Sequence, residues 1–461
     1  MTMNPGTPEI ENSEYKRELG LFASVSIVIG KIIGSGIFRT PGPIMALALS
    51  TSLFGLVWLL AGIITILCAM IYAELVAMLP KSGGPYVFLK EAYHPVWAFL
   101  RGWAMFFVSE TGSIAVVALV FAEYLNALWA VFFGEYFSKF YVVAIALSAI
   151  WILTVVNFFG VYISGIIQSV FSSAKIIAIG GIIGAAFASS KGNFHNFTTD
   201  FWPKEFTWET FLALGAAMRL AFFTFSGWEG STYVAEEVKN PKKNLPLSLF
   251  LGITGVILLY AGANIAYIYI LPVEVMKGST LVAYDAMKTA LGGAGGIFIS
   301  AAVMLNTFGN VSTQIFCKAR TWQAMSRDGL FFKSLEKLSP KFKTPNNALI
   351  AQAAWASVLL IFASSAKNSY EAIIDFFSAN GTIWNIMTFY SIHLLRKKYP
   401  DMERPYKAWL YPYSLIAVIF FYAIYLAVSL ITAFKASMMG ILLTSTGLIY
   451  YWFFIHKKNK V

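Results

Sequence analysis

Cysteine, histidine and charged residues are all scarce in this sequence of 461 residues. It contains 2 cysteines and 4 histidines, and only 12% of its residues are charged. Cys68 and Cys317 both fall inside apolar stretches, so no disulfide framework is expected, and they are predicted to be small buried residues. The histidines are scattered, which argues against a metal centre. No cofactor is expected. The sequence also shows no cluster of a nucleophile with an acid and a base, so it does not indicate an enzyme.

The scarcity of charge points to a membrane protein, because an average soluble domain has about 25% charged residues. Hydrophobic residues make up 58% of this chain, and its mean hydropathy is +0.67. The net charge of +11 does not indicate nucleic-acid binding, since the basic residues lie in short loops between apolar stretches rather than on one patch. Basic loops of this kind set topology and contact anionic membrane lipid.

A transmembrane helix needs about 20 apolar residues, and the sequence predicts an all-α membrane protein with about twelve such helices. Lys and Arg gather in alternate loops, which predicts a multi-pass cell-membrane protein with both termini in the cytoplasm. A short helix over 281–291 is expected across the outer mouth. The predicted spans are 20–48, 51–78, 96–127, 140–159, 162–188, 210–238, 246–271, 295–325, 347–365, 370–395, 409–433 and 436–456.

Small residues interrupt two of these spans. Gly34, Ser35 and Gly36 interrupt the first, and Ser226 and Gly227 interrupt the sixth. In lipid, a broken helix leaves backbone groups unpaired at a cost of several kcal/mol per group, unless the break lines a cavity. Paired breaks in corresponding positions of two halves therefore predict the central site of a secondary transporter.

The spacing of the two breaks predicts two inverted five-helix repeats, with broken helices 1 and 6, followed by two C-terminal helices. An odd number of spans in each repeat requires the two copies to insert with opposite orientation. The predicted divisions are a cytoplasmic segment at 1–19, a first repeat at 20–188, a second repeat with an outer loop at 189–395, and helices 11 and 12 with a cytoplasmic C-terminus at 396–461.

The two ends of a broken helix carry opposite partial charges. If helix 1 stops near Ile33 and restarts near Ile37, the first end presents carbonyl groups and the second presents N–H groups. An ammonium fits the carbonyls and an anion fits the N–H groups, so together they match a free α-amino acid. Gly30 and Gly34 are also spaced as a close-packing pair between helices, which is the structural alternative.

Further motifs accompany the breaks. They are Gly34-Ser35-Gly36-Ile37-Phe38, Pro80-Lys81-Ser82-Gly83-Gly84-Pro85-Tyr86, Gly227-Trp228, and Glu236-Glu237-Val238-Lys239-Asn240-Pro241 with Asn244 and Pro246. In combination they resemble the L-type amino-acid transporters of the amino acid, polyamine and organocation superfamily. The resemblance extends from the N-terminal segment to the last spans.

The resemblance implies a role for each residue at the breaks. The amides of Ser35 and Gly36 would hold the substrate carboxylate, and the carbonyls of Ile32, Phe223 and Ser226 would hold its ammonium. Phe223 would also close over the substrate, although an ordinary packing aromatic is the alternative. The implied substrate-binding set is Ile32, Gly34, Ser35, Gly36, Phe223, Ser226 and Gly227.

Lys175 lies about 12 residues, or roughly 18 Å, from either end of span 5, too far to reach water by snorkelling. A cation at that depth costs at least about 2.5 to 3.5 kcal/mol, so a partner is expected. The resemblance places Lys175 where sodium-coupled relatives bind sodium, bridging the first break to span 8 at Asn310. If Lys175 stays charged, it implies sodium-independent exchange. If it titrates, a proton can be co-transported.

Other charges bear on the substrate and on an inner gate. Glu110 stands where the resembled family carries a basic residue, and an ion pair with Arg219 is one expectation. Alternatively, Glu110 or Glu229 faces the pocket and favours a cationic amino acid or an amine. Glu236 and Glu237, at the inner end of span 6, are expected either to meet basic partners at a gate or to be solvated. The charges that depart from the family pattern are Lys31, Glu110, Arg219 and Glu229.

The predicted function is sodium-independent exchange of small or medium neutral amino acids by alternating access. Its partners would be a free amino acid and membrane lipid, with no nucleic acid. A proton-coupled symporter is the alternative. Eukaryotic members of the resembled family are linked to a heavy chain by a cysteine between spans 3 and 4. The loop at 130–139 has none, so no disulfide-linked heavy chain is expected.

Overall fold

The computed structural model describes residues 17–159, 161–203, 205–365 and 369–456, without the side chains of 161–172, 174 and 456. Helices dominate this part of the chain, because a backbone in lipid must satisfy its hydrogen bonds within each segment. Ten helical stretches within it are long and apolar enough to cross a membrane. They are Leu21–Arg39, Thr51–Met78, Pro95–Phe133, Lys139–Phe159, Trp208–Glu237, Pro241–Ile270, Gly293–Arg327, Asn346–Ala363, Tyr413–Thr432 and Phe434–Ile455.

Two more helices lie at the predicted places of spans five and ten. They are α9 (Val161–Ala188) and α16 (Ser369–Lys398). Only Lys175–Ala188 of α9 falls among the apolar helices of the described residues. The middle of α16 has too many Asn, Ser and Thr residues to be as apolar as the ten. The all-helical membrane fold is confirmed, whereas the count of twelve spans and the division into inverted repeats stay predictions.

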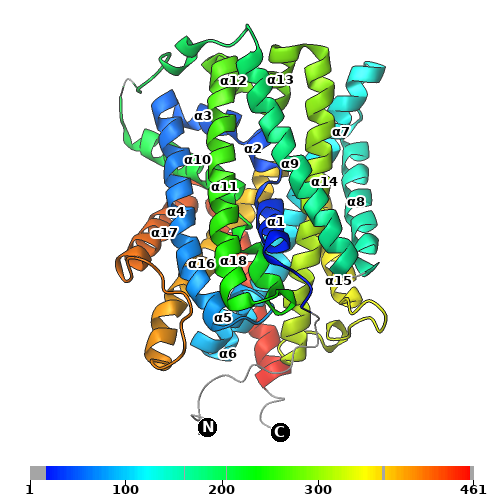
Figure 1. Ribbon diagram of the computed structural model, residues 1–461, viewed down its shortest axis with the longest axis vertical. Coiled ribbons are helices and arrows are strands. Elements are labelled where there is room, and N and C mark those ends of the chain that lie inside the picture. The colour runs from blue at the N-terminus through cyan, green and yellow to red at the C-terminus, as the bar shows by residue number, and fades with distance from the viewer. Residues whose placement is uncertain (1–16, 160, 204, 366–368, 457–461) are drawn as a thin grey trace.

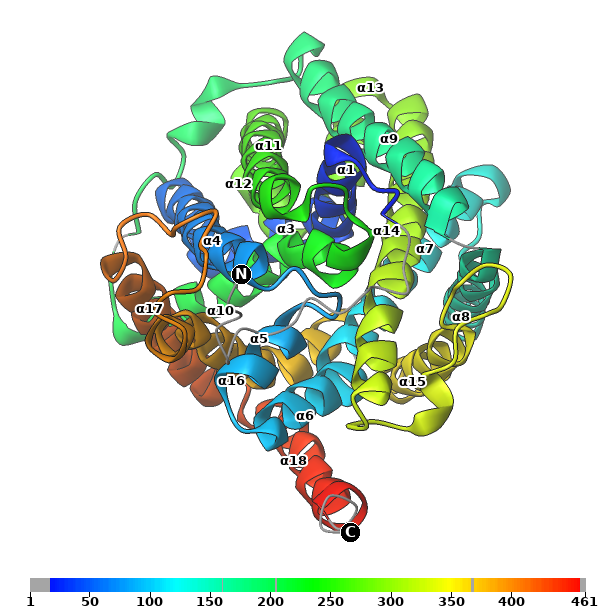
Figure 2. The ribbon, with the colours of Figure 1, turned by 60° about the horizontal axis from the view of Figure 1, so that its bottom comes forward.

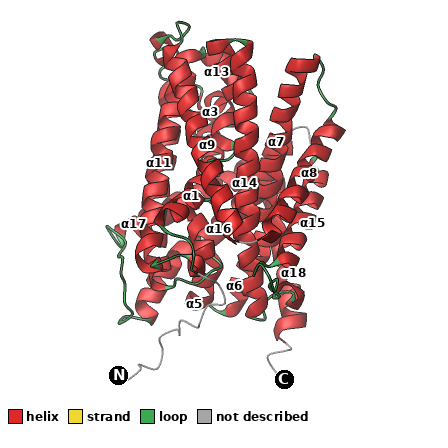
Figure 3. Cartoon of the chain, turned by 45° about the vertical axis from the view of Figure 1, so that its right-hand side comes forward, coloured by secondary structure: helices red, strands yellow, loops and turns green. Residues whose placement is uncertain are grey.

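The helices run between two ends of a bundle, and most of the connecting chain lies at those ends (Figures 1 and 3). The short helix α5 (Pro85–Ala92) and the start of α6 (Pro95–Ala104) lie at one end. At the opposite end lie α12 (Val273–Gly278) and α13 (Val282–Leu291). The prediction of a short helix over 281–291 is therefore confirmed.

The first span sits inside the bundle rather than at its edge (Figure 2). Its first half, α1 (Leu21–Ile32), contacts α9, α11 (Pro241–Ile270) and α14 (Gly293–Arg327). The same half also contacts η4 (Trp228–Glu237), the second half of the sixth span. The C-terminal helices α17 (Tyr413–Thr432) and α18 (Phe434–Tyr450) pack against α16, away from α1. Both halves of the predicted site are thus enclosed by other helices.

The third span contains a segment of π-helix, η1 (Met105–Ser109), between α6 and α7 (Glu110–Phe133). A π segment shifts the hydrogen-bond register and frees carbonyl groups, and such segments are frequent at functional sites. Here the Thr111 hydroxyl donates to the Phe106 carbonyl over 2.6 Å, and the Trp355 indole donates to the Phe107 carbonyl over 2.9 Å. Glu110, the first residue of α7, follows the π segment directly.

The remaining membrane helices follow the predicted spans closely. They are α4 (Thr51–Met78), α8 (Lys139–Val156), α10 (Trp208–Phe225) and α15 (Asn346–Ala363). The first span continues beyond α1 as α2 (Gly36–Arg39) and α3 (Pro41–Ala48).

Candidate functional site

The first span breaks between α1 and α2. Ile33 has a ψ of 88°, which takes the chain out of the helix, and α2 begins after Ser35. The N–H of Gly34 donates to the Ile32 carbonyl over 2.8 Å, and the Tyr260 hydroxyl donates to the same oxygen over 3.1 Å. The Ile32 carbonyl, which was predicted to hold a substrate ammonium, thus has two partners within the protein.

The sixth span breaks at Ser226 and Gly227, between α10 and η4. Ser226 is extended, with a ψ of 156°, and Gly227 has a φ of 93°, a left-handed conformation that favours glycine. The N–H and the hydroxyl of Ser226 both donate to the Phe223 carbonyl, over 3.1 and 2.7 Å. The predictions that spans 1 and 6 are broken are both confirmed.

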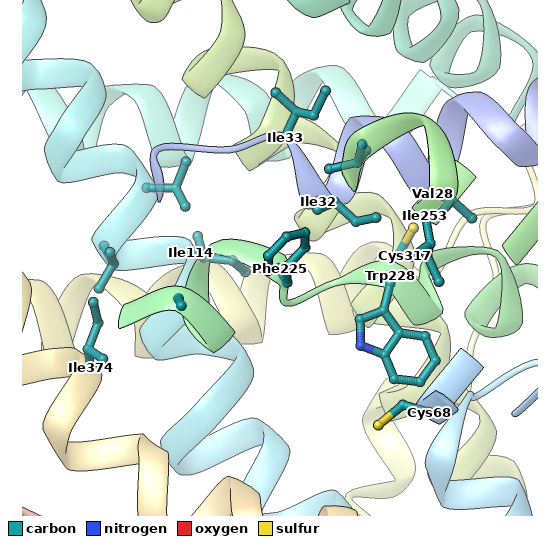
Figure 4. Packing of buried hydrophobic residues seen from close by; sticks show 14 of the residues in the cluster. Val28, Ile32, Ile33, Cys68, Ile114, Phe225, Trp228, Ile253, Cys317 and Ile374 are labelled. Atoms are coloured by element: carbon teal, nitrogen blue, oxygen red, sulfur yellow. The ribbon is translucent and has the colours of Figure 1, made fainter. Parts of the chain in front are cut away.

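The two breaks face each other. The Tyr260 hydroxyl of α11 lies 3.1 Å from the Ile32 carbonyl and 3.2 Å from the Thr224 carbonyl, so one side chain contacts both. A β-carbon added to Gly36 would lie 2.6 Å from the Thr224 hydroxyl oxygen, and one added to Gly227 would lie 3.0 Å from the Lys31 carbonyl. Figure 4 shows Ile32 and Ile33 close to Phe225, where both ribbons leave their helical course.

A cavity of about 150 Å³ lies beside the second break. Ile32, Gly34, Ser35 and Gly36 are all buried and are not among the residues that line it. The Ser35 hydroxyl is buried with no hydrogen-bond partner among the described residues. The sequence-predicted residues that do line the cavity are Glu110, Arg219, Phe223, Ser226, Gly227 and Glu229.

Aromatic side chains cover the cavity next to Phe223. The Phe223 ring lies 5.7 Å from the Tyr370 ring and 6.0 Å from the Phe377 ring, measured between centroids. The Arg39 guanidinium stacks 4.3 Å from the centroid of Tyr370 and forms an ion pair with Glu123. Phe223 therefore lies between the cavity and an aromatic cluster, a position that suits the predicted role of closing over a bound substrate.

Lys175 and Asn310 converge on the end of α1. The Lys175 ammonium is buried and donates to the Gly30 carbonyl over 2.5 Å. The Asn310 amide donates to the same carbonyl over 2.9 Å and to the Lys31 carbonyl over 2.8 Å. Carbonyls in the last turn of a helix carry partial negative charge, so a cation is stabilised there. Lys175 therefore has a partner, as its depth requires.

The expected ion pair between Glu110 and Arg219 is wrong. Glu110 pairs with Lys318 of α14 at 2.7 Å, since α7 packs directly against α14. Arg219 pairs instead with Asp375 of α16 at 3.3 Å and donates to Thr432 of α17. Both Glu110 and Arg219 line the cavity.

Lys31 and Glu229 form a second ion pair in the cavity, at 3.2 Å. This pair links the end of α1 to the start of η4. The Lys31 ammonium also lies 4.0 Å from the centroid of the Tyr233 ring, and the Tyr233 hydroxyl donates to Glu229 over 3.3 Å. Glu110 and Glu229, one of which was expected to face the pocket in the alternative prediction, thus both line the cavity, and each has a lysine partner.

Comparison with known proteins agrees with this geometry. A family model described as amino acid permease matches residues 19–455. The chain belongs to the amino acid permease family. It is therefore a membrane transporter, not an enzyme. The described residues contain no group of three or more His, Cys, Asp or Glu that could hold a metal ion.

Several curated relatives are similar to this permease over nearly its full length. The b(0,+)-type amino acid transporter 1 of Mus musculus is 30% identical over 98% of this chain and 90% of the relative. The serine/threonine exchanger SteT of Bacillus subtilis (strain 168) is 30% identical over 96% of this chain and 98% of the relative. The large neutral amino acids transporter small subunit 2 of Mus musculus is 32% identical over 99% of this chain and 86% of the relative. These likenesses support the resemblance to the L-type transporters.

Among the charged residues of the cavity, sequence reasoning missed Lys318 and Arg101. A signal for Lys318 was present, because Asn310, Gln314 and Lys318 follow one another at intervals of four on α14, which places them on one face. Lys318 donates to Gln314 over 2.6 Å, and Gln314 donates to Asn310 over 2.6 Å. Arg101 stands near the start of its span, where an arginine usually extends to the membrane surface.

Basic partners meet the two glutamates at the end of η4. Glu237 pairs with Arg320 of α14 at 3.1 Å, and both side chains are fully buried. Glu236 lies 3.6 Å from Arg327 and accepts from the Ser82 N–H over 3.0 Å. The carbonyl of Glu237 also accepts from the N–H groups of Glu18 and Leu19, just before α1. The expectation of basic partners is confirmed, and these contacts hold α1, η4 and α14 together at this end of the permease.

Arg320→Gln is expected to destabilise the permease by about 3 to 5 kcal/mol, because it leaves the Glu237 carboxylate buried without a counter-ion. Arg327→Gln is the matched control. The Arg327 side chain is 32% exposed, so its loss should cost less than about 1 kcal/mol. Thermal unfolding of the two purified variants measures the difference. Equal melting temperatures would show that the buried pair does not hold this end closed.

Proposed function

We propose that this permease is a sodium-independent exchanger of L-amino acids that works by alternating access. The observation that carries the proposal is the pair of facing helix breaks, with a lysine ammonium on the carbonyls at the end of α1. In secondary transporters, discontinuous helices of this kind bind the charged groups of the substrate, and helix C-termini hold the coupling cation. The exchanger named among the similar proteins supports the same mode of transport.

The backbone charges of the substrate would bind at the breaks. The N–H groups of Ser35 and Gly36 begin a helix and suit a carboxylate. The carbonyls of Ile32, Phe223 and Ser226 suit an ammonium, with Gly34 and Gly227 supplying the irregular backbone. Two of these carbonyls already accept two hydrogen bonds each, so an ammonium can reach them only if the breaks open. Substrate binding and movement of the breaks are thus linked.

Lys175 would act as a fixed cation that takes the place of sodium. It lies on the Gly30 carbonyl together with Asn310, so a sodium ion would have to displace an ammonium from the same oxygen. A tethered cation cannot be carried across the membrane, and a substrate gradient must then drive transport. Exchange follows if the empty permease reorients slowly.

The charges of the cavity weigh against the cationic alternative. Glu110 and Glu229 are neutralised by Lys318 and Lys31, so neither is available to a cationic side chain. We therefore place small or medium neutral amino acids first among the substrates. The proposed orientation has both termini in the cytoplasm, with Glu237 and Arg320 at the inner gate. Cys68 and Cys317 are both buried, so no disulfide to a heavy chain is proposed.

Counterflow in proteoliposomes tests the proposal. Labelled serine or alanine should accumulate only when the vesicles hold unlabelled amino acid, and replacing sodium by choline should leave the rate unchanged. Accumulation driven by a pH gradient alone, with empty vesicles, would favour the proton-coupled symporter instead. Uptake that requires sodium would refute the assignment to Lys175.

A further inference from the structure

The cavity beside the second break carries an excess of positive charge. Four cationic and two anionic side chains line it. They are Lys31, Arg101, Arg219, Lys318, Glu110 and Glu229. Three of the cations have carboxylate partners: Lys31 with Glu229 at 3.2 Å, Lys318 with Glu110 at 2.7 Å, and Arg219 with Asp375 at 3.3 Å.

Arg101 differs from the other three. It forms no ion pair or hydrogen bond with any side chain or backbone group among the described residues, although it is only 4% exposed. Its Nε–H is fully buried without an acceptor. A buried charge without a counter-ion costs several kcal/mol, and the side of Arg101 that remains open is the cavity.

Arg101 and the second break line the same cavity. Ser226 and Gly227 belong to its lining, so one ligand in this space can meet both the second break and the guanidinium. Glu110 does not take the place of a ligand here, because its carboxylate pairs with Lys318 and no ion pair or hydrogen bond joins it to Arg101. The group that the cavity lacks is therefore an anion on the ligand.

We propose that Arg101 binds the side-chain carboxylate of an acidic amino acid, and that this permease exchanges aspartate or glutamate besides neutral amino acids. This inference rests on the proposed function and extends its range of substrates. A carboxylate is the expected anion because the planar guanidinium fork donates two parallel hydrogen bonds to its two oxygens. An acidic side chain also offsets the excess positive charge of the cavity, which a neutral side chain leaves in place.

The test compares glutamate with glutamine, which has the same shape and no charge. Purified permease in proteoliposomes is loaded with unlabelled serine, and uptake of labelled glutamate and glutamine is measured. Wild-type protein should take up both. Arg101→Gln should lower glutamate uptake about tenfold or more while changing glutamine uptake little, since only glutamate loses charge-assisted hydrogen bonds. Arg101→Lys keeps the charge and should retain part of the glutamate uptake.

Two controls make the result decisive. Arg327→Gln removes an arginine that lies outside the cavity lining, and it should leave the ratio of glutamate to glutamine uptake unchanged. A thermal-shift assay on the wild-type protein, which needs no variant, should show stabilisation by glutamate. Transport of neutral amino acids without glutamate or aspartate would overturn this inference and leave the proposed function standing. An equal loss of both substrates in Arg101→Gln would also overturn it. Failure to exchange any amino acid would overturn the proposed function as well.

Discussion

Lys175→Met should lower amino-acid exchange at least about tenfold while the protein still folds. The methionine has nearly the volume of the lysine but no charge, so the variant removes the contact with the Gly30 carbonyl without opening a large cavity. A cation at a helix C-terminus in a partly buried setting is worth up to about 2 kcal/mol, and that stabilisation of the end of α1 is lost. Counterflow rates in proteoliposomes measure the effect. Lys191→Met, on the exposed loop after α9, is the matched control.

A second variant tests whether Lys175 affects transport through its contact with the end of α1 at the first break. Asn310 donates to the same Gly30 carbonyl, so Asn310→Ala and Lys175→Met should interact strongly. Residues that share one partner show non-additive effects, whereas independent sites add. The double variant is therefore expected to be scarcely worse than Lys175→Met alone. Normal exchange by Lys175→Met would remove this lysine from the mechanism, and strictly additive losses would separate its role from the break.

The sequence was sufficient to predict the two breaks and the need of Lys175 for a partner. Glycine and serine in the middle of an apolar run indicate a broken helix, and a broken helix within a membrane is tolerated mainly where it lines a binding site. A lysine in the middle of a span carries its own requirement for a partner. What the sequence did not show was that the partner is the Gly30 carbonyl, since backbone acceptors leave no trace in the residue pattern.

Pairing between charges was harder to predict, as Glu110 shows. The sequence offered Arg219 as a cation for Glu110. Which cation Glu110 meets, however, depends on how the helices are rotated and at what depth each residue lies. Because α7 packs on α14, Glu110 forms its ion pair with Lys318 instead. The role of Tyr260 in linking Ile32 to Thr224 was likewise out of reach, because three residues far apart in sequence meet only in the folded bundle.

Gly36→Ala is expected to abolish transport, because the new β-carbon would lie 2.6 to 2.8 Å from three atoms of Thr224. One of those atoms is the Thr224 α-carbon, at 2.8 Å, so a change of side-chain rotamer cannot relieve the contact. The two breaks must move apart, which displaces the Ser35 and Gly36 N–H groups from the carbonyls opposite. Gly55→Ala is the matched control, since that glycine lies on α4 with nothing within 4 Å of an added β-carbon. It should transport normally and be slightly more stable.

Gly34→Ala should have an intermediate effect that identifies the close approach of the breaks as the cause. There the added β-carbon would meet the Asn310 side chain at 3.1 to 3.3 Å, and a side chain can shift by the few tenths of an ångström required. Thr224→Ser shortens the Thr224 side chain but leaves its α-carbon in place, so it should not rescue Gly36→Ala. Counterflow rates for the three glycine variants should therefore fall in the order Gly55, Gly34, Gly36. Full activity of Gly36→Ala would mean that transport does not depend on the close contact between spans 1 and 6, and the proposed grip on the substrate backbone would fail with it.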